Sequence, residues 1–265
     1  MIRDTILEVQ NLTKVYATGL FRKKYTTAVN DVSFRIARGE IVSLVGESGS
    51  GKTTVAKIIL RLLPPTSGSV MYKGEDVWDK KDIRKLKEYW REVHAVFQDP
   101  FAAFNPMYPV DRVLNQAFEL MDMPPDESAI REVLKVVALS PDEVLGKYPH
   151  ELSGGQRQRI MIARCFLLRP QLIIADEPVS MVDASTRSSL INLFLKLRDE
   201  NRTSMIFITH DLGLAYHVSD RILIMYKGRI VEEGLPDELI SNPKEEYTRS
   251  LLESVPLLFR KWEGF

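Results

Sequence analysis

The chain has 265 residues, of which 45% are hydrophobic and 27% are charged, and its 36 basic and 36 acidic residues leave a net charge of zero. This composition is ordinary for a folded domain and excludes a disordered chain, a collagen-like fibre and a coiled-coil rod. Zero net charge argues against nucleic acid as the main partner. With one cysteine, Cys165, the chain has no internal disulfide, and we expect a reducing compartment. We find no signal peptide and no apolar run of about 18 residues that would span a bilayer.

Taken in chain order, short apolar runs alternate with segments of helical periodicity. The runs predict strands at residues 6–9, 29–36, 41–45, 172–175, 205–208 and 222–225, with a loop at 16–27. The periodic segments predict helices at residues 53–63, 113–121, 127–138, 156–168, 184–201 and 211–217. We expect the stretch 75–92 to form a solvated face and Cys165 to be a small core residue. The order of elements predicts an α/β fold with a mostly parallel core sheet and a helical insert at about residues 109–168.

A phosphate-binding motif follows the apolar run 41–45. The residues Gly46-Glu47-Ser48-Gly49-Ser50-Gly51-Lys52-Thr53 match G-x-x-x-x-G-K-[ST], with a strand predicted before them and a helix after them. Glycines let backbone N–H groups converge on an anion, and the helix N-terminus adds partial positive charge. Lys52 is expected to reach the β- and γ-phosphates, and the Thr53 hydroxyl is a suitable ligand for Mg²⁺.

Two acidic residues end the apolar run 172–175. Strands often end in solvated acids, but in a chain with a phosphate loop we expect Asp176 to hold Mg²⁺ and Glu177 to orient or deprotonate the attacking water. A second N–H-rich helix start occurs at Leu152-Ser153-Gly154-Gly155-Gln156, and one bound ATP does not obviously need both cradles.

With these motifs in this order, the sequence resembles the ATP-binding cassette (ABC) ATPases over nearly its whole length. The resemblance implies a P-loop NTPase fold with an antiparallel β subdomain, and a head-to-tail dimer in which each ATP lies between the P-loop of one subunit and the LSGGQ segment of the other. It also implies that Tyr16 stacks on adenine, that Gln98 contacts Mg²⁺ and the attacking water, and that His210 contacts the γ-phosphate. Ser180-Met181-Val182-Asp183 resembles the D-loop.

The residues expected to act fall into three groups. The catalytic group is Glu177, His210, Gln98 and Lys52, and the metal ligands are Thr53, Gln98 and Asp176. The nucleotide-binding residues are Tyr16, Gly46, Glu47, Ser48, Gly49, Ser50, Gly51, Lys52, Thr53, Thr54, Ser153, Gly154, Gly155, Gln156 and Asp183. Tyr16, Gln98 and His210 each have an alternative as an ordinary structural residue, and Phe101, Phe104 and Tyr108 are either core residues or the lining of a groove for a partner helix.

Within the ABC ATPases, the sequence is most similar to the ATPase subunits of oligopeptide and dipeptide importers. The resemblance is carried by segments 96–106, 174–180 and 242–252, and the insert around Gly19-Leu20-Phe21 resembles the second of the two ATPases in such importers. It implies an ATPase domain at residues 1–233, a C-terminal extension at 234–265, and ATP and Mg²⁺ as ligands. It further implies a homologous ATPase subunit and two membrane permease subunits as partners, a substrate-binding protein, and a place on the cytoplasmic face of the membrane.

Three alternatives remain from the sequence. The first is an importer whose cargo is an oligosaccharide or nickel. Some importers of this group carry these solutes, and the sequence does not distinguish the cargoes because the ATPase does not touch the transported solute. A non-transport ABC ATPase is a second possibility, although such proteins often carry paired cassettes, coiled-coil inserts or basic surfaces. A P-loop kinase is a third, but that assignment leaves Leu152–Gln156 unexplained.

Overall fold

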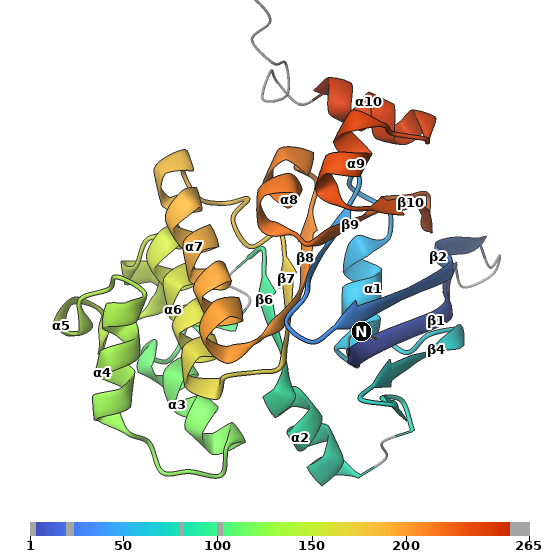
Figure 1. Ribbon diagram of the computed structural model, residues 1–265. Helices are drawn as coiled ribbons and strands as arrows, with labels where there is room; N and C mark the ends of the chain where they lie inside the picture. The colour runs from blue at the N-terminus through green and yellow to red at the C-terminus, as the bar shows by residue number, and fades with distance from the viewer. Residues whose placement is uncertain (1–3, 20–23, 80–81, 100–102, 255–265) are drawn as a thin grey trace, which may run out of the picture. The chain divides into compact units, whose positions relative to one another are not determined.

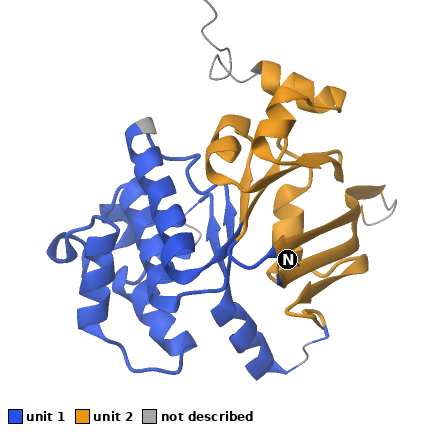
Figure 2. Cartoon of the chain, in the orientation of Figure 1, with its two compact units in different colours: residues 1–4, 37–39, 79–205 blue, residues 5–36, 40–78, 206–265 orange. Residues whose placement is uncertain are grey.

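The computed structural model of the chain describes residues 4–19, 24–79, 82–99 and 103–254 (Figure 1). The chain divides into two compact units, each assembled from separate stretches of sequence (Figure 2). Unit 1 comprises residues 1–4, 37–39 and 79–205, and unit 2 comprises residues 5–36, 40–78 and 206–265.

Unit 2 contains an antiparallel sheet. Its strands are β1 (Thr5–Thr18), β2 (Lys24–Ala37), β4 (Ser67–Tyr72) and β5 (Glu75–Asp76), in the order β2-β1-β4-β5. Strand β4 pairs with β1 and with β5 in antiparallel register. In β2, buried residues alternate with exposed ones, as expected for a sheet with one solvated face. The antiparallel part of the fold expected from the sequence is therefore present.

Unit 2 also contains the strands that lead into the phosphate-binding motif. They are β3 (Ile41–Val45), β8 (Ser204–Thr209), β9 (Arg221–Tyr226) and β10 (Arg229–Gly234), in the order β10-β9-β3-β8. Strand β9 is parallel to β3 and antiparallel to β10. All five residues of β3 are buried, as required for a strand covered on both faces. The helices of this unit are α1 (Lys52–Ile59), α8 (Leu212–Val218), α9 (Pro236–Ser241) and α10 (Glu246–Ser254).

Unit 1 is mainly helical. Its parallel strands β6 (Val93–Phe97) and β7 (Leu172–Asp176) pair along their whole length. Its helices are α2 (Ile83–Glu92), α3 (Asp111–Leu120), α4 (Glu127–Val136), α5 (Pro141–Val144), α6 (Gly154–Leu168) and α7 (Ala184–Asn201). Helix α6 contacts α3, α4 and α7 (Figure 1) and carries most of its apolar residues toward the interior. Cys165 and His94 are both buried there, and burial lowers the pKa of His94 to about 3, so its imidazole is neutral.

The sequence predictions hold best for buried elements. Strand β3 and helix α7 have the predicted bounds, and the parallel pairs confirm a mostly parallel core sheet. The predicted loop at 16–27 is wrong at both ends, because β1 continues to Thr18 and β2 already begins at Lys24. Residues 20 and 21 of the predicted insert lie outside the described part of the chain. Strands β4, β5, β6 and β10 were not predicted.

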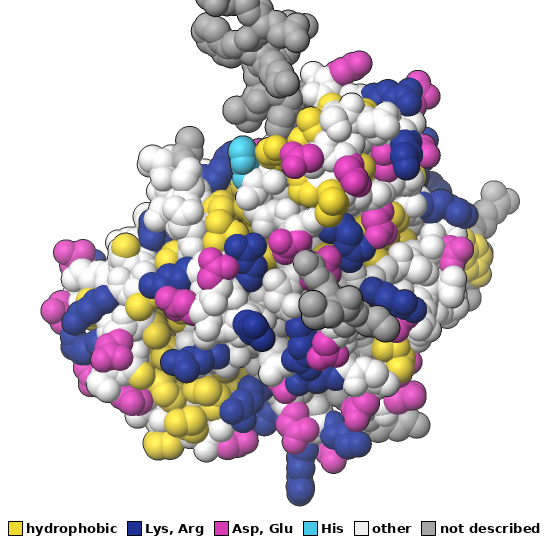
Figure 3. All heavy atoms as spheres, in the orientation of Figure 1, with side chains coloured by type: hydrophobic (Ala, Val, Ile, Leu, Met, Phe, Trp, Pro, Cys, Tyr) yellow, Lys and Arg dark blue, Asp and Glu magenta, His cyan; other side chains and the backbone are white. Residues whose placement is uncertain are grey.

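Two further predictions are corrected in part. Helix α1 ends at Ile59 rather than at residue 63, because Arg61 has a positive φ of 59° and the N–H groups of Leu62 and Leu63 turn back to the Lys57 carbonyl. The stretch 75–92 is largely exposed, as expected, but it contains helix α2, whose Tyr89 is buried. On the face seen in Figure 3, basic and acidic side chains are interspersed, in keeping with zero net charge. Every helix in the described ranges is too short or too polar to cross a membrane.

Candidate functional site

The phosphate-binding motif forms the connection between β3 and α1 in unit 2. Helix α1 begins at Lys52, directly after Gly51, whose φ of +108° is a conformation that glycine adopts easily. The Lys52 side chain is buried, and its ammonium group donates hydrogen bonds to the carbonyls of Gly46 (2.6 Å) and Glu47 (2.8 Å). The cation is thus held inside the loop, where a phosphate oxygen would meet it.

Two glycines of the loop lie against backbone that leaves no room for a side chain. A Cβ atom on Gly46 would lie 2.1 Å from the carbonyl oxygen of Met225, and one on Gly51 would lie 2.3 Å from the carbonyl oxygen of Ala28. The turn between β9 and β10 also contacts the loop, since the N–H of Gly228 donates a hydrogen bond to the Ser50 carbonyl (2.9 Å). The close backbone approach explains why glycine is needed at these positions.

We expect Gly46→Ala to destabilise the protein more than the matched change Gly74→Ala. The Gly46 variant must displace backbone, at a cost of about 1–3 kcal/mol or more. A Cβ on Gly74 meets nothing within 4 Å, so that variant bears only the strain of its φ of +81°, about 1 kcal/mol. Denaturant unfolding of both variants measures the difference, and equal losses would contradict the steric argument.

The other residues of the motif differ in exposure. Glu47, Ser48, Gly49 and Thr53 are exposed, Thr54 is half-buried, and Ser50 is buried. The exposed Thr53 hydroxyl lies in the first turn of α1, at the positive end of the helix. An oxygen donor beside an anion cradle is the chemistry that Mg²⁺ bound to phosphates requires, so these residues fit a magnesium-nucleotide ligand.

Two more predicted residues also belong to unit 2. Tyr16 lies in β1, is 36% exposed, and has the Lys14 ammonium 5.6 Å from its ring centre. The Tyr16 side chain is therefore accessible to solvent, as a base-stacking role requires. His210 is exposed and directly follows β8, the strand next to β3 in the sheet order.

Three predicted residues lie at the carboxyl end of the β6–β7 pair in unit 1. Phe97 pairs with Asp176 in parallel register at the ends of β6 and β7, so Gln98 and Glu177 each directly follow a paired strand end. Asp176 is buried, whereas Gln98 is exposed. Glu177 has a positive φ of 51°, and its carbonyl accepts hydrogen bonds from the Ser180 N–H and hydroxyl. A non-glycine residue held in this sparsely populated conformation is a frequent feature of functional sites.

The LSGGQ segment begins helix α6 in unit 1. The Ser153 side chain accepts from the Gln156 N–H (3.2 Å), and the Gln156 side chain accepts from the Ser153 N–H (2.9 Å). This reciprocal cap satisfies the backbone N–H groups of Ser153 and Gln156. The N–H groups of Gly154 and Gly155 are in the first turn of the helix, where the helix itself supplies no acceptor. These two groups are the ones that an anion would meet.

Two cavities border this segment within unit 1. One, of about 340 Å³, is lined by Gln98, Asp99, Gly154, Arg157, Gln158, Pro178, Met181 and Val182. The other, of about 270 Å³, includes Ser153, Gly155 and Gln156 among its lining residues. The first cavity therefore brings the predicted glutamine loop, LSGGQ segment and D-loop together.

Asp183, the last residue of the predicted D-loop, caps helix α7. Its carboxylate accepts from the Thr186 N–H and from the hydroxyls of Ser185 and Thr186. The Ser185 hydroxyl and the two groups of Thr186 lower the pKa of Asp183 to about 2, so the carboxylate is charged. Of the aromatic residues with open roles, Phe104 is buried, Tyr108 is exposed, and Phe101 lies outside the described residues.

Sequence reasoning missed a side chain that forms a hydrogen bond with the phosphate-binding motif. The Glu47 N–H donates to the hydroxyl of Tyr247, on helix α10, at 2.9 Å. The only signal in the sequence was the segment 242–252, which was noted for its resemblance and given no role.

Comparison with known proteins places the chain in a family. The sequence profile of the ABC transporter family matches residues 29–180, which is more than half of the chain. The chain belongs to the ABC transporter family. It is accordingly an ABC-type ATPase with the P-loop fold expected from its motifs.

The sequence is similar to those of several relatives over most of its length. The oligopeptide transport ATP-binding protein AppF of Bacillus subtilis (strain 168) is 41% identical over 96% of this ABC transporter chain and 79% of the relative. OppF of the same organism, also named an oligopeptide transport ATP-binding protein, is 40% identical over 96% of the chain and 83% of the relative. A putative peptide import ATP-binding protein of Brucella ovis is 40% identical over 97% of this chain and 80% of the relative.

Solved structures share the fold. A dimeric structure of the ATP-binding cassette MJ0796 in a post-hydrolysis state, bound to ADP and Pi, matches with a TM-score of 0.78 and 28% identity, covering 87% of this chain and 99% of that one. The structure of cbiO1 from Clostridium perfringens, part of the ABC transporter complex cbiONQ, matches with a TM-score of 0.75 and 25% identity over 96% of both chains.

Proposed function

We propose that the chain is the ATP-hydrolysing subunit of an ABC importer that takes up oligopeptides or dipeptides. The observation that carries the proposal is the 40–41% identity, over 96–97% of the chain, to proteins named for oligopeptide transport or peptide import. Segment 242–252, which suggested this group from the sequence, lies beyond the matched family profile at 29–180.

The phosphate-binding motif is proposed to hold the triphosphate. Backbone N–H groups of Gly46–Thr53, with the positive end of α1, would surround the phosphates, and Lys52 would exchange its bonds to loop carbonyls for bonds to phosphate oxygens. Thr53 and Asp176 would ligate Mg²⁺, which offsets phosphate charge when bound. The buried cation and the closely packed glycines support this assignment.

The residues at the β6–β7 edge are proposed to serve hydrolysis. Glu177 would orient or deprotonate the attacking water, Gln98 would contact that water and the metal, and His210 would contact the γ-phosphate. The pairing of Phe97 with Asp176, which brings both residues to the same end of the β6–β7 pair, supports a shared role for these two. The assignment of His210, Tyr16 and the P-loop to the same ATP rests on the resemblance of these positions to those of the ABC ATPases.

We propose a head-to-tail dimer with a homologous ATPase subunit, in which the Ser153–Gln156 segment and Asp183 face the nucleotide of the partner. The dimeric structures of the related cassette MJ0796 support dimerisation. The N–H groups of Gly154 and Gly155 at the start of α6 suit the γ-phosphate of an ATP bound by another subunit. In such a dimer, the phosphate-binding motif and the LSGGQ segment of each subunit would both bind phosphate.

The remaining partners follow from the importer assignment. We propose two permease subunits in the membrane, a substrate-binding protein, and a place for this chain on the cytoplasmic face. The loop after Gln98 would transmit the motion of the helices within about residues 109–168 to the permeases. Residues 1–233 would form the ATPase domain and residues 234–265 its C-terminal extension.

Deleting the gene in the source cell tests the cargo. We expect uptake of a radiolabelled tetrapeptide to be lost, restored by the wild-type chain, and not restored by Glu177→Gln. Uptake of maltotriose and of nickel serves as the control for the alternative cargoes. Unchanged peptide uptake together with lost uptake of either control solute would overturn the peptide assignment.

A further inference from the structure

We propose that Tyr247 is a positioning residue for the phosphate-binding loop, and that helix α10 thereby sets the affinity of the chain for nucleotide. The inference rests on the proposed role of the loop in binding ATP. It assigns a part in nucleotide binding to the C-terminal segment, which lies beyond the matched family profile.

The contact joins residues that are 200 positions apart in the sequence. The backbone N–H of Glu47 donates to the Tyr247 hydroxyl at 2.9 Å, and the Tyr247 side chain is half-buried. The Tyr247 ring stacks on that of Tyr226, with ring centres 4.1 Å apart and planes at 29°. A stacked pair of this kind fixes the ring, and the fixed ring fixes the hydroxyl.

Tyr226 belongs to the segment that already braces the loop. It ends β9, one residue after Met225, whose carbonyl oxygen closes the space beside Gly46. Two residues further on, the Gly228 N–H donates to the Ser50 carbonyl. The Tyr226–Tyr247 stack therefore joins α10 to the turn that holds the other side of the loop.

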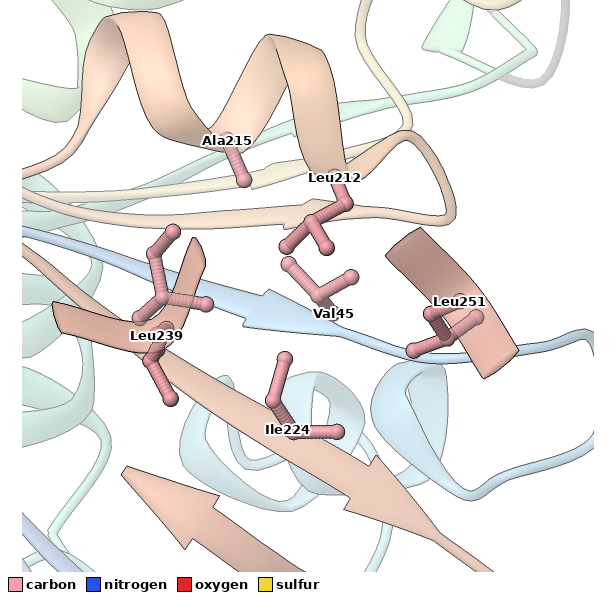
Figure 4. Packing of buried hydrophobic residues seen from close by; sticks show 7 residues of the cluster. Val45, Leu212, Ala215, Ile224, Leu239 and Leu251 are labelled. Atoms are coloured by element: carbon pink, nitrogen blue, oxygen red, sulfur yellow. The ribbon is translucent and has the colours of Figure 1, made fainter. Parts of the chain in front are cut away.

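Helix α10 is itself fixed at both ends. The Glu232 carboxylate accepts from the N–H groups of Lys244 (2.8 Å) and Glu245 (3.2 Å), just before the helix begins. Further along, Leu251 is buried in an apolar cluster that includes Val45 (Figure 4). Val45 is the residue directly before Gly46, so α10 shares an apolar cluster with the residue before that glycine and forms a hydrogen bond with the residue after it.

The arrangement affects affinity through the shape of the loop. A phosphate is bound when several N–H groups converge on it, and the apparent affinity falls in proportion to the fraction of time the loop spends in that shape. A hydrogen bond of this type contributes about 0.5–1.5 kcal/mol, which corresponds to a change of about two- to tenfold. Bound nucleotide orders the loop, so saturating ATP removes the difference.

The test compares Tyr247→Phe with Tyr216→Phe in the full chain. Tyr216 lies on helix α8, and its hydroxyl donates a hydrogen bond of 2.7 Å to the Asp237 carboxylate on α9. The control therefore loses the same group from the same residue type. Binding of fluorescent mant-ATP gives Kd, and hydrogen exchange of peptides covering residues 46–51 reports the ordering of the loop. Steady-state hydrolysis in the assembled complex gives KM and kcat.

We expect Tyr247→Phe to raise Kd and KM about two- to tenfold, to speed exchange in the loop, and to leave kcat unchanged, whereas Tyr216→Phe matches the wild type in all of them. Equal Kd values for both variants, or weaker binding without faster loop exchange, would overturn the inference. Lys52→Ala measured alongside separates the two proposals. If it weakens binding while Tyr247→Phe does not, only the role of Tyr247 fails; if it has no effect, the proposed loop function fails.

Discussion

Replacing Glu177 by Gln is expected to abolish ATP hydrolysis while ATP binding is retained. A general base contributes about 10²–10⁴-fold to rate, so we expect kcat to fall by at least about 100-fold. Gln keeps the size of the side chain, and the turn is held by the Glu177 carbonyl, which the substitution leaves intact. The variant should therefore fold normally and lack only the carboxylate.

The same variant is expected to accumulate as a dimer when ATP and Mg²⁺ are present. ATP would hold the two subunits together, and hydrolysis, which separates them, would be blocked. Light scattering after size exclusion, in the presence of any required sister chain, measures the dimer, and mant-ATP titration measures binding. Glu200→Gln is the matched control, because Glu200 is an exposed partner of Lys196 outside every motif. Normal turnover in Glu177→Gln would remove this residue from its proposed role.

Replacing Lys52 by Ala is expected to weaken nucleotide binding itself. The ammonium group is held inside the loop by the carbonyls of Gly46 and Glu47, so it needs little reorganisation to meet a phosphate. Hydrogen bonds from a charged donor contribute about 1.5–3 kcal/mol each, so we expect Kd for mant-ATP to rise at least about tenfold.

The control for this change is Lys57→Ala, one and a half turns along the same helix. The Lys57 side chain is exposed, and we expect its removal to leave Kd within about twofold, because water weakens the interaction of an exposed charge with other charges. Thermal unfolding of both variants checks that the fold survives. An unchanged Kd for Lys52→Ala would exclude this side chain from the binding site.

The two halves of the candidate site were predictable to different degrees. The P-loop is encoded in one short segment: a wholly apolar strand, glycines at the tight positions and a lysine at the helix start, so its strand–loop–helix form follows from local chemistry. Asp176 and Glu177 were found because a buried apolar strand ends in two acids. That Phe97 pairs with Asp176, so that Gln98 and Glu177 follow paired strand ends, is a matter of strand register that no local pattern contains.

Edge strands and the C-terminal segment show where sequence reasoning is weaker. Strand β10 is partly polar and only one of its six residues is buried, so its sequence shows little alternation of apolar and polar residues. Strands β1 and β2 extend through residues whose composition is typical of a loop. Strand pairing stabilised these segments although their local preferences did not.

The sequence by itself determined the family, the phosphate loop, the LSGGQ segment and the acidic strand end, because each depends on residues adjacent in the chain. Only the tertiary structure decided that Met225 and Ala28 crowd the glycines and that Tyr247 contacts Glu47. Contacts between residues far apart in the chain depend on how whole strands and helices pack, and the free energy of that packing is spread over many side chains, so no short segment encodes it.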